Sequence, residues 1–189
     1  MLLRSILPLF AFALVASAPA LAAETIPVAH FNSVELRGGG NVAISPGPAE
    51  RVAIVEGSAR FTRIYVDRHG SLKIDVCNND CPRNYRLRVE IQSPRVPVLA
   101  VDGGGVINVG GGFGAVPALT LAVNGGGKID TRAVNAGDVT AAVNGGGQLF
   151  VQARSELTGA VRGGGVIRYW GNPAVTSVID GGGSIQPGH

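Results

Sequence analysis

Aromatic and charged residues are scarce in this sequence, and their scarcity narrows the possible functions. Aromatic side chains make up 5% of the 189 residues, and charged side chains make up 15%. The 16 Lys and Arg residues form no cluster and the formal net charge is only +3. Nucleic acid is therefore not an expected partner. Beyond Ala22, no apolar stretch is long enough to cross a membrane as a helix.

Metal ligands and nucleophiles are also few. The chain has two cysteines, and its three histidines, His30, His69 and His189, are scattered along the sequence. Metal ligation or base catalysis needs several such groups to converge, so we interpret the histidines as exposed loop residues. No glycine triplet opens a helix or is followed by Lys-Ser or Lys-Thr, so no phosphate-binding loop is predicted. We expect neither a metal nor a cofactor.

Residues 1–22 have the pattern of a secretory signal peptide. Arg4 gives the positive start, residues 5–18 are almost wholly apolar, and residues 20–22 read Ala-Leu-Ala, the small-x-small pattern that signal peptidase needs. We predict cleavage after Ala22, with a retained membrane anchor as the alternative. The mature chain, residues 23–189, would be a single exported domain in the periplasm or on the cell surface.

Glycine is the residue present in excess. The 29 glycines are about twice the usual share of roughly 7%. In the second half of the chain, setting aside one triplet at residue 110 with different surroundings, triplets begin at residues 103, 125, 145, 163 and 181. Their spacing of roughly 20 residues is typical of a solenoid repeat. An apolar residue lies two positions before each of these triplets and another lies two positions after it, as strand alternation requires.

A unit of about 20 residues cannot bury its apolar face alone, but stacked copies can share one core. We therefore predict an all-β fold in which residues 98–189 form a right-handed parallel β-helix, or solenoid, of about five coils. Residues 24–97 are predicted to be a β-rich N-terminal section that caps the first coil. Within it, residues 33–42 read as an isolated copy of the repeat, and residues 187–189 are expected to close the other end.

The triplets are predicted to form tight corners, because glycine tolerates positive φ and close backbone approach. We expect that replacing Gly126 or Gly146 by valine destabilises the fold. The predicted corner glycines are Gly103, Gly104, Gly105, Gly125, Gly126, Gly127, Gly145, Gly146, Gly147, Gly163, Gly164, Gly165, Gly181, Gly182 and Gly183.

The residue before each triplet should lie on one edge of the stack, so that these residues form a ladder. Asn124 should stack on Asn144, a device also found in cross-β assemblies, and Arg162 should neighbour Asp180. We interpret the ladder as structural, with a ligand-binding stripe as the alternative. Its members are Asp102, Asn124, Asn144, Arg162 and Asp180.

Cys77 and Cys81 flank three residues, and in an oxidising compartment we predict a disulfide between them. A redox pair would prefer two intervening residues. A zinc site is the other alternative, but only His69 lies close enough in sequence to share it.

Two further groups of residues could carry function. A carbohydrate-active β-helix enzyme would place carboxylates on one coil face, but the short coils leave little to wall a substrate, and we predict no enzyme. The candidate carboxylates are Asp102, Asp130, Asp138 and Asp180. Arg168, Tyr169 and Trp170 suit contact with a carbohydrate or a protein, with packing at the cap as the alternative.

With these features, the chain resembles the putative auto-transporter adhesin head GIN domain family of exported bacterial proteins. The resemblance runs from about residue 31 to residue 185. It rests on Phe31-Asn32-Ser33-Val34, residues 41–44, residues 70–74, residues 170–175 and residues 180–185. It implies a β-helix-like fold at the cell envelope, an adhesive role and no established catalytic residues. We expect a non-catalytic module that binds an envelope glycan or protein; a purely structural envelope protein is the alternative.

Overall fold

The computed structural model describes residues 23–77 and 80–188. These residues form fifteen strands and no helix, which confirms the all-β class. Accordingly, within this part of the chain no helix is long and apolar enough to cross a membrane. The signal peptide predicted for residues 1–22, and His189, lie outside the described residues.

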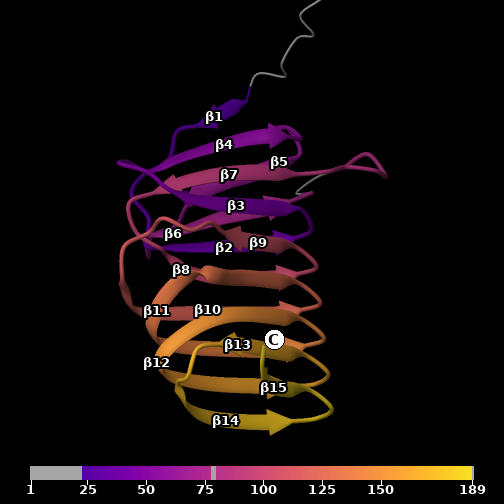
Figure 1. Cartoon of the computed structure of the whole chain (residues 1–189). Helices are drawn as coiled ribbons and strands as arrows, with labels where there is room; N and C mark the ends of the chain where they lie inside the picture. The colour runs from indigo at the N-terminus through magenta and orange to yellow at the C-terminus, as the bar shows by residue number, and fades with distance from the viewer. Residues whose placement is uncertain (1–22, 78–79, 189) are drawn as a thin grey trace, which may run out of the picture.

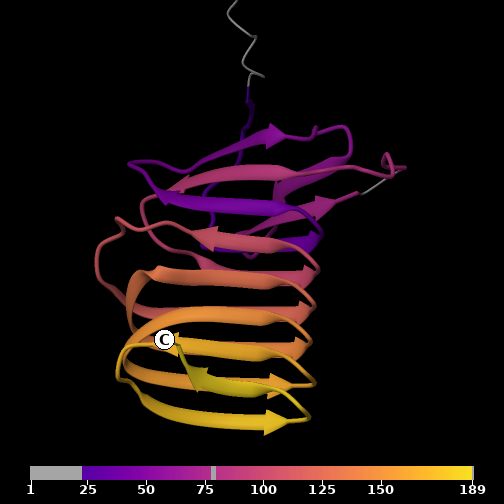
Figure 2. The same cartoon turned by 45° about the vertical axis from the view of Figure 1, so that its right-hand side comes forward.

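Two sets of parallel strands, joined at the glycine triplets, make up residues 98–187. The first set contains β8 (Val98–Gly103), β10 (Val116–Gly125), the C-terminal parts of β11 (Lys128–Gly145) and β12 (Gln148–Arg162), and β14 (Ala174–Asp180). The second contains β9 (Val106–Val109), the N-terminal parts of β11 and β12, β13 (Val166–Trp170) and β15 (Ser184–Pro187). We call one strand of each set, with the triplet between them, a rung. Each rung pairs in parallel with the next, and Figures 1 and 2 show the corners along one edge of the stack.

The apolar residue two positions before each triplet points into the core. Val101, Val123, Val143 and Val161 are register partners in successive rungs, and each is at most 1% exposed. The residues two positions after the triplets are buried in the same way in the first four of these rungs, at Ile107, Ile129, Leu149 and Ile167. Full burial of such a side chain contributes about 1.5–3 kcal/mol, which offsets the chain entropy that each glycine costs, about 0.5–1 kcal/mol.

The copy of the repeat at residues 33–42 is not isolated, contrary to the sequence prediction. Strand β2 (Ser33–Gly38) pairs in parallel with β8, and β3 (Asn41–Pro46) pairs in parallel with β9. The corner at residues 38–40 therefore stacks on the corner at residues 103–105. The sequence hides this contact because the two rungs are far apart along the chain, with four other strands between them.

The intervening residues lie on the far side of this rung and close the N-terminal end. Strand β6 (Ser71–Val76) continues the parallel stack on β2, and β7 (Arg88–Ser93) continues it on β3. Three further strands pair antiparallel at this end: β4 (Arg51–Glu56) on β7, β5 (Thr62–Val66) on β6, and β1 (Glu24–Ile26) on β4. The predicted division at residue 97 thus falls between two stacked rungs.

The opposite end of the stack is open. Strand β14, the lowest strand in Figures 1 and 2, pairs only with β12 among the described residues. Ile179 follows Val161 in the apolar column but is 45% exposed, and Val178 is 65% exposed. Of residues 187–189, which are expected to close this end, Pro187 belongs to β15, the last strand of the second set, and β14 stays exposed.

The three glycines of a corner have different surroundings. Gly125 has φ 109°, and a Cβ there would lie 2.8 Å from the carbonyl oxygen of Gly103. A Cβ on Gly127 would collide with Val101 and lie 2.7 Å from the carbonyl oxygen of Gly105. The middle glycine, Gly126, has no positive φ and nothing within 4 Å of the Cβ position, and the same holds for Gly146. The expected sensitivity of these two middle positions to a side chain is therefore not supported.

Candidate binding face

The residues that precede the triplets are register partners along the corner edge. Asn144 Nδ2 donates a hydrogen bond of 3.0 Å to Asn124 Oδ1. Sequence analysis missed two members of this ladder. Arg37 could have been found from the sequence, because it precedes the glycine triplet at residues 38–40. Asp75 could not, because it precedes no triplet. The full order is Asp75, Arg37, Asp102, Asn124, Asn144, Arg162 and Asp180.

No two acidic and no two basic residues are neighbours in this ladder. Arg37 lies between Asp75 and Asp102, with its Nη1 3.6 Å from Asp75 Oδ1. Exposed ion pairs of this kind contribute about 0–1 kcal/mol. The order of charges in the ladder therefore avoids repulsion between stacked rungs, as the structural interpretation expects.

A second polar group lies beside the ladder on β2 and β6. Lys73 Nζ donates a hydrogen bond to Glu35 Oε2, and Arg37 Nε donates one of 2.5 Å to Glu35 Oε1. Burial raises the pKa of Glu35, but the hydrogen bonds and charges of Lys73 and Arg37 outweigh it and hold this pKa below its ordinary value. The group ties neighbouring strands together in its charged form.

The predicted disulfide between Cys77 and Cys81 is present, with the two Cα atoms 5.5 Å apart. It follows β6, at the edge where glycine corners turn the other rungs, and Cys77 has a positive φ of 62°. Within residues 23–77 and 80–188, no group of three or more His, Cys, Asp or Glu side chains could hold a metal ion.

The four candidate carboxylates do not come together. Asp102 and Asp180 belong to the corner ladder and are four pairing steps apart. Asp130 lies on the second strand set, where it pairs with Arg132. Asp138 is exposed on β11 opposite Glu156. The arrangement of a carbohydrate-active enzyme, with two carboxylates and a base in one groove, is not formed by these four residues.

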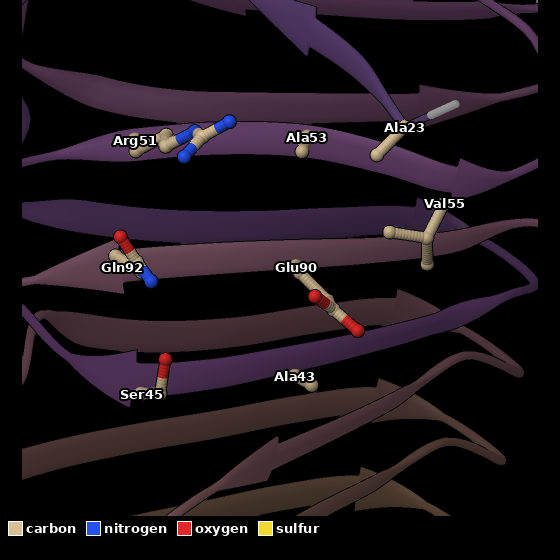
Figure 3. Close-up of a pocket in the computed structure, with 8 residues that line it drawn as sticks. All are labelled: Ala23, Ala43, Ser45, Arg51, Ala53, Val55, Glu90 and Gln92. Atoms are coloured by element: carbon tan, nitrogen blue, oxygen red, sulfur yellow. The ribbon is translucent and has the colours of Figure 1, made fainter. Parts of the chain in front are cut away.

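The outward face formed by the second strand set and its continuation through β3, β7 and β4 has two features that sequence analysis did not predict. The first is a hollow of about 390 Å³ over β3, β4 and β7 (Figure 3). Glu90 stands between Ala53 and Ala43, which are its register partners on either side. Arg51 and Gln92 lie along one side of the hollow. Short alanine side chains beside longer polar ones produce the depression. Ala23 and three separate strands line it, so no local sequence motif predicts it.

The second feature is a cluster of aromatic and charged side chains on β11, β12 and β13. The Phe150 and Trp170 rings are 6.2 Å apart, centroid to centroid. Lys128 Nζ lies 4.6 Å from the centre of the Phe150 ring. The Arg132 guanidinium carbon lies 5.5 Å from the Phe150 centroid and 5.2 Å from that of Trp170. We call Lys128, Asp130, Arg132, Phe150, Arg168 and Trp170 the aromatic–cation cluster.

Sequence analysis identified residues 168–170 as possible contact residues, and these account for only part of the cluster. Trp170 is half-buried against Phe150 and Arg168 is exposed beside it, whereas Tyr169 packs on the hydrophobic core. Phe150 and Lys128 come from earlier rungs, and each sits in an ordinary strand pattern. They are close only because of the register between stacked rungs, and the sequence of one segment does not predict that register.

Asp130 organises the cations of the cluster. Arg132 Nε donates to Asp130 Oδ1 at 2.9 Å, and Arg132 Nη2 donates to Asp130 Oδ2 at 2.6 Å. Burial raises the pKa of Asp130, but hydrogen bonds from Arg132 and the charges of Arg132 and Lys128 outweigh it and lower this pKa overall. The Asp130 side chain is 14% exposed and that of Arg132 is 52% exposed. The cluster therefore presents its cations outward and its single carboxylate inward.

One column of register partners joins the hollow and the cluster. Neighbouring strands lie about 4.8 Å apart, so Ala43 at the hollow and Phe150 in the cluster, three strands away, are about 14 Å apart. The column consists of Glu90, Ala43, Asn108, Asp130, Phe150, Arg168 and Gln186.

Comparison with known proteins agrees with the resemblance seen in the sequence. Residues 99–173 match the model of a family described as putative auto-transporter adhesin, head GIN domain. This segment includes Phe150, Trp170 and the other members of the aromatic–cation cluster. No curated protein gives a significant match.

Several solved structures resemble the chain. The structure of a putative adhesin from Bacteroides fragilis has 19% sequence identity and a TM-score of 0.52, over 88% of this chain and 96% of that one. A putative adhesin from Parabacteroides merdae has 16% identity and a TM-score of 0.42, over 89% and 96%. A putative lipid binding protein from Parabacteroides distasonis has 16% identity and a TM-score of 0.43, over 89% and 96%. At such identities the first likeness speaks for a shared fold only.

Proposed function

Since residues 99–173 match the head domain of putative auto-transporter adhesins, we propose that this protein is an exported, non-catalytic binding module of the cell envelope. Residues 23–189 would be its single mature domain, and its rungs would follow a right-handed parallel β-solenoid. The parallel register of successive rungs supports the solenoid. The signal-peptide pattern of residues 1–22 supports export.

The outward face of the second strand set is the observation on which the binding role rests. Its side chains project from paired strands, so their spacing is held by the backbone hydrogen bonds of neighbouring rungs. Among the described residues it offers a hollow of about 390 Å³ and the aromatic–cation cluster, both on an outward strand face. Such a surface suits contact with an extended partner better than chemistry on a small one.

Retention of the mature protein on envelope material tests this function. Residues 23–189, shown to be folded by circular dichroism, would be incubated with washed cell envelopes and with isolated envelope polysaccharide. We expect saturable retention that soluble polysaccharide competes away, with no new reducing ends after prolonged incubation. Release of reducing ends would favour an enzyme. The absence of retention on every fraction would favour a purely structural protein.

Export is tested separately with the full chain in a bacterial host. We expect the secreted or periplasmic form to begin at Ala23. A variant with Ala20→Asp and Ala22→Asp should keep residues 1–22 because it lacks the small residues at the cleavage site. A wild-type protein whose exported form still begins at Met1 would contradict the proposed cleavage.

A further inference from the structure

We propose that the aromatic–cation cluster binds an acidic polysaccharide, whose uronate or other anionic groups contact Lys128, Arg132 and Arg168 while a sugar ring packs on Phe150 and Trp170. The inference rests on the proposed binding function and adds to it a site and a ligand class. Three observations support it: the exposed rings, the local charge and the polar groups around them.

The two rings supply apolar surface between the cations: Lys128 and Arg132 lie over their faces, and Gly188 packs against Trp170. Phe150 lies at the centre, with Asp130 and Arg168 as its register partners on the two sides. Phe150 and Trp170 are only half-buried, although aromatic side chains are few in this chain. Aromatic rings bordered by a few oriented polar groups are typical of ligand sites, and Trp and Arg are enriched where binding energy concentrates.

The charge of the cluster selects an anionic ligand. Three cations and one carboxylate give the cluster a formal charge of +2, against +3 for the whole chain. Asp130 engages Nε and Nη2 of Arg132, which leaves Nη1 of a half-exposed guanidinium for a ligand. Among the described residues, Arg168 has no ion-pair partner. A guanidinium binds a carboxylate or sulfate in a directed, charge-assisted way.

Neighbouring amides fit the hydroxyl groups of a sugar. Gln148 is the register partner of Lys128, Gln152 is that of Trp170, and Asn108 is that of Asp130. Gln148 and Gln152 flank Phe150 on β12, and Asn108 extends the site along the column toward the hollow. The hollow contributes one carboxylate, Glu90, and one cation, Arg51, so it adds no net positive charge for an acidic ligand. The site therefore comprises β9, β11, β12 and β13 and stops before β3.

Other anionic polymers fit less well. An acidic peptide backbone with carboxylate side chains would pair with the cations, but it has no pyranose ring whose C–H face could pack on Phe150 and Trp170. Single-stranded nucleic acid could stack on the rings, yet it needs a basic groove that follows several phosphates, and the Lys and Arg residues of this chain form no such run. A saccharide that carries anionic groups at intervals matches both features.

Trp170 provides a direct readout, because it is the only tryptophan of the chain. The mature protein would be titrated with galacturonate oligomers at low salt, and its fluorescence would be recorded together with calorimetry. We expect a saturable change in Trp170 fluorescence that weakens as NaCl is added, because added salt screens the ion pairs. Neutral dextran oligomers should give no change.

Variants locate the site. Arg132→Ala and Phe150→Ala should each weaken galacturonate binding at least about tenfold, which corresponds to about 1.4 kcal/mol. Arg88→Ala is the matched control, because Arg88 is an exposed arginine on β7, outside the cluster, and it should bind like the wild type. Circular dichroism and melting curves would establish that each variant is folded. If a variant does not fold, the fluorescence titration of the wild-type protein still tests the site.

Each outcome decides between named alternatives. Galacturonate binding that leaves Trp170 fluorescence and the Arg132→Ala affinity unchanged would place the ligand elsewhere and overturn the site. Equal or tighter binding of polyglutamate or of oligo-dT would overturn the ligand class. Envelope retention without galacturonate binding would also overturn the ligand class while the proposed function stands. If the protein is retained on no envelope fraction, the proposed function itself fails.

Discussion

The Cγ1 methyl group of Val123 occupies the place where a side chain on Gly147 would begin. Val123 lies two positions before its own triplet, and Gly147 is the last glycine of the triplet in the next rung. The pair shows that the apolar column and the glycine corners are one device, since the valine of each rung fills the space that the next corner leaves empty. The same relation joins Val101 to Gly127, Val143 to Gly165, and Val161 to Gly183.

Gly147→Ala should therefore destabilise the protein by about 1–3 kcal/mol, the usual cost of overpacking. Gly146→Ala is the matched control in the same corner, because nothing lies within 4 Å of the position that its Cβ would take. It should be neutral or add about 0.4–1 kcal/mol by restricting the unfolded chain. Urea unfolding of the two variants measures the difference. Equal losses at both positions would show that the corner tolerates no side chain at all.

An apolar side chain on the open strand β14, beside the end of the apolar column, should be far less sensitive than the middle of that column. Val161→Ala should cost about 2 kcal/mol, because Val161 is 0% exposed and its loss leaves a cavity. Val178→Ala, on the open strand β14, should cost less than about 1 kcal/mol, because Val178 is 65% exposed. Thermal melting of both variants tests the gradient. A large loss at Val178 would mean that another surface covers β14 in solution.

Stability should fall in acid partly through Glu35. Its pKa is lowered in the folded protein, so it stabilises the fold above its unfolded pKa of about 4.5, and this contribution is lost as pH falls through the folded value. Lys73→Met removes one hydrogen-bond donor and should cost about 2 kcal/mol at pH 7. It should also flatten the decline in stability between pH 5 and pH 3. Urea unfolding at several pH values checks this.

The exposed pair of Arg88 and Glu90 provides the control variant, Arg88→Met, whose pH profile should follow the wild type. If Lys73→Met keeps the wild-type slope, the pairing of Lys73 with Glu35 does not cause the decline.

Loss of the Cys77–Cys81 disulfide should cost about 2 kcal/mol on the loop-entropy model for so short a loop. Cys77→Ser with Cys81→Ser removes it, and the free energy of unfolding with and without a reducing agent measures the cost. The double variant should not respond to the reducing agent. A wild-type protein whose stability is the same under reducing and oxidising conditions would show that the disulfide adds nothing.

The repeating parts of the fold were predictable because each rung repeats a local pattern. An apolar residue two positions before a triplet predicted the buried positions of Val101, Val123 and Val143, and the all-β class followed from the same alternation. The pattern failed at Ile179, which has the right sequence spacing but no following rung to cover it. Burial at a repeat position depends on the next copy, so the last copy differs.

The candidate site was largely unpredictable because stacking builds it. Phe150, Lys128 and Trp170 come from three different rungs, and each alone reads as an outward residue of a strand. Likewise the hollow beside Glu90 depends on Ala43 and Ala53, two alanines in different strands. Only the register of neighbouring strands brings such residues together, and a single sequence does not specify that register for residues 24–97.

The position of β2 and β3 inside the stack has a consequence for the order of folding. Val34 of β2 pairs with Leu99 of β8, which lies much further along the chain, whereas the later rungs join segments that directly follow one another. Loop closure makes distant pairings slow, so we expect the rungs of β10, β11 and β12 to form first and the N-terminal segment to dock onto them late. In pulsed hydrogen exchange, amides of β10 to β12 should gain protection before those of β2. A newly made chain would then lack a stable folded core until most of its length is available, which would suit the export proposed above.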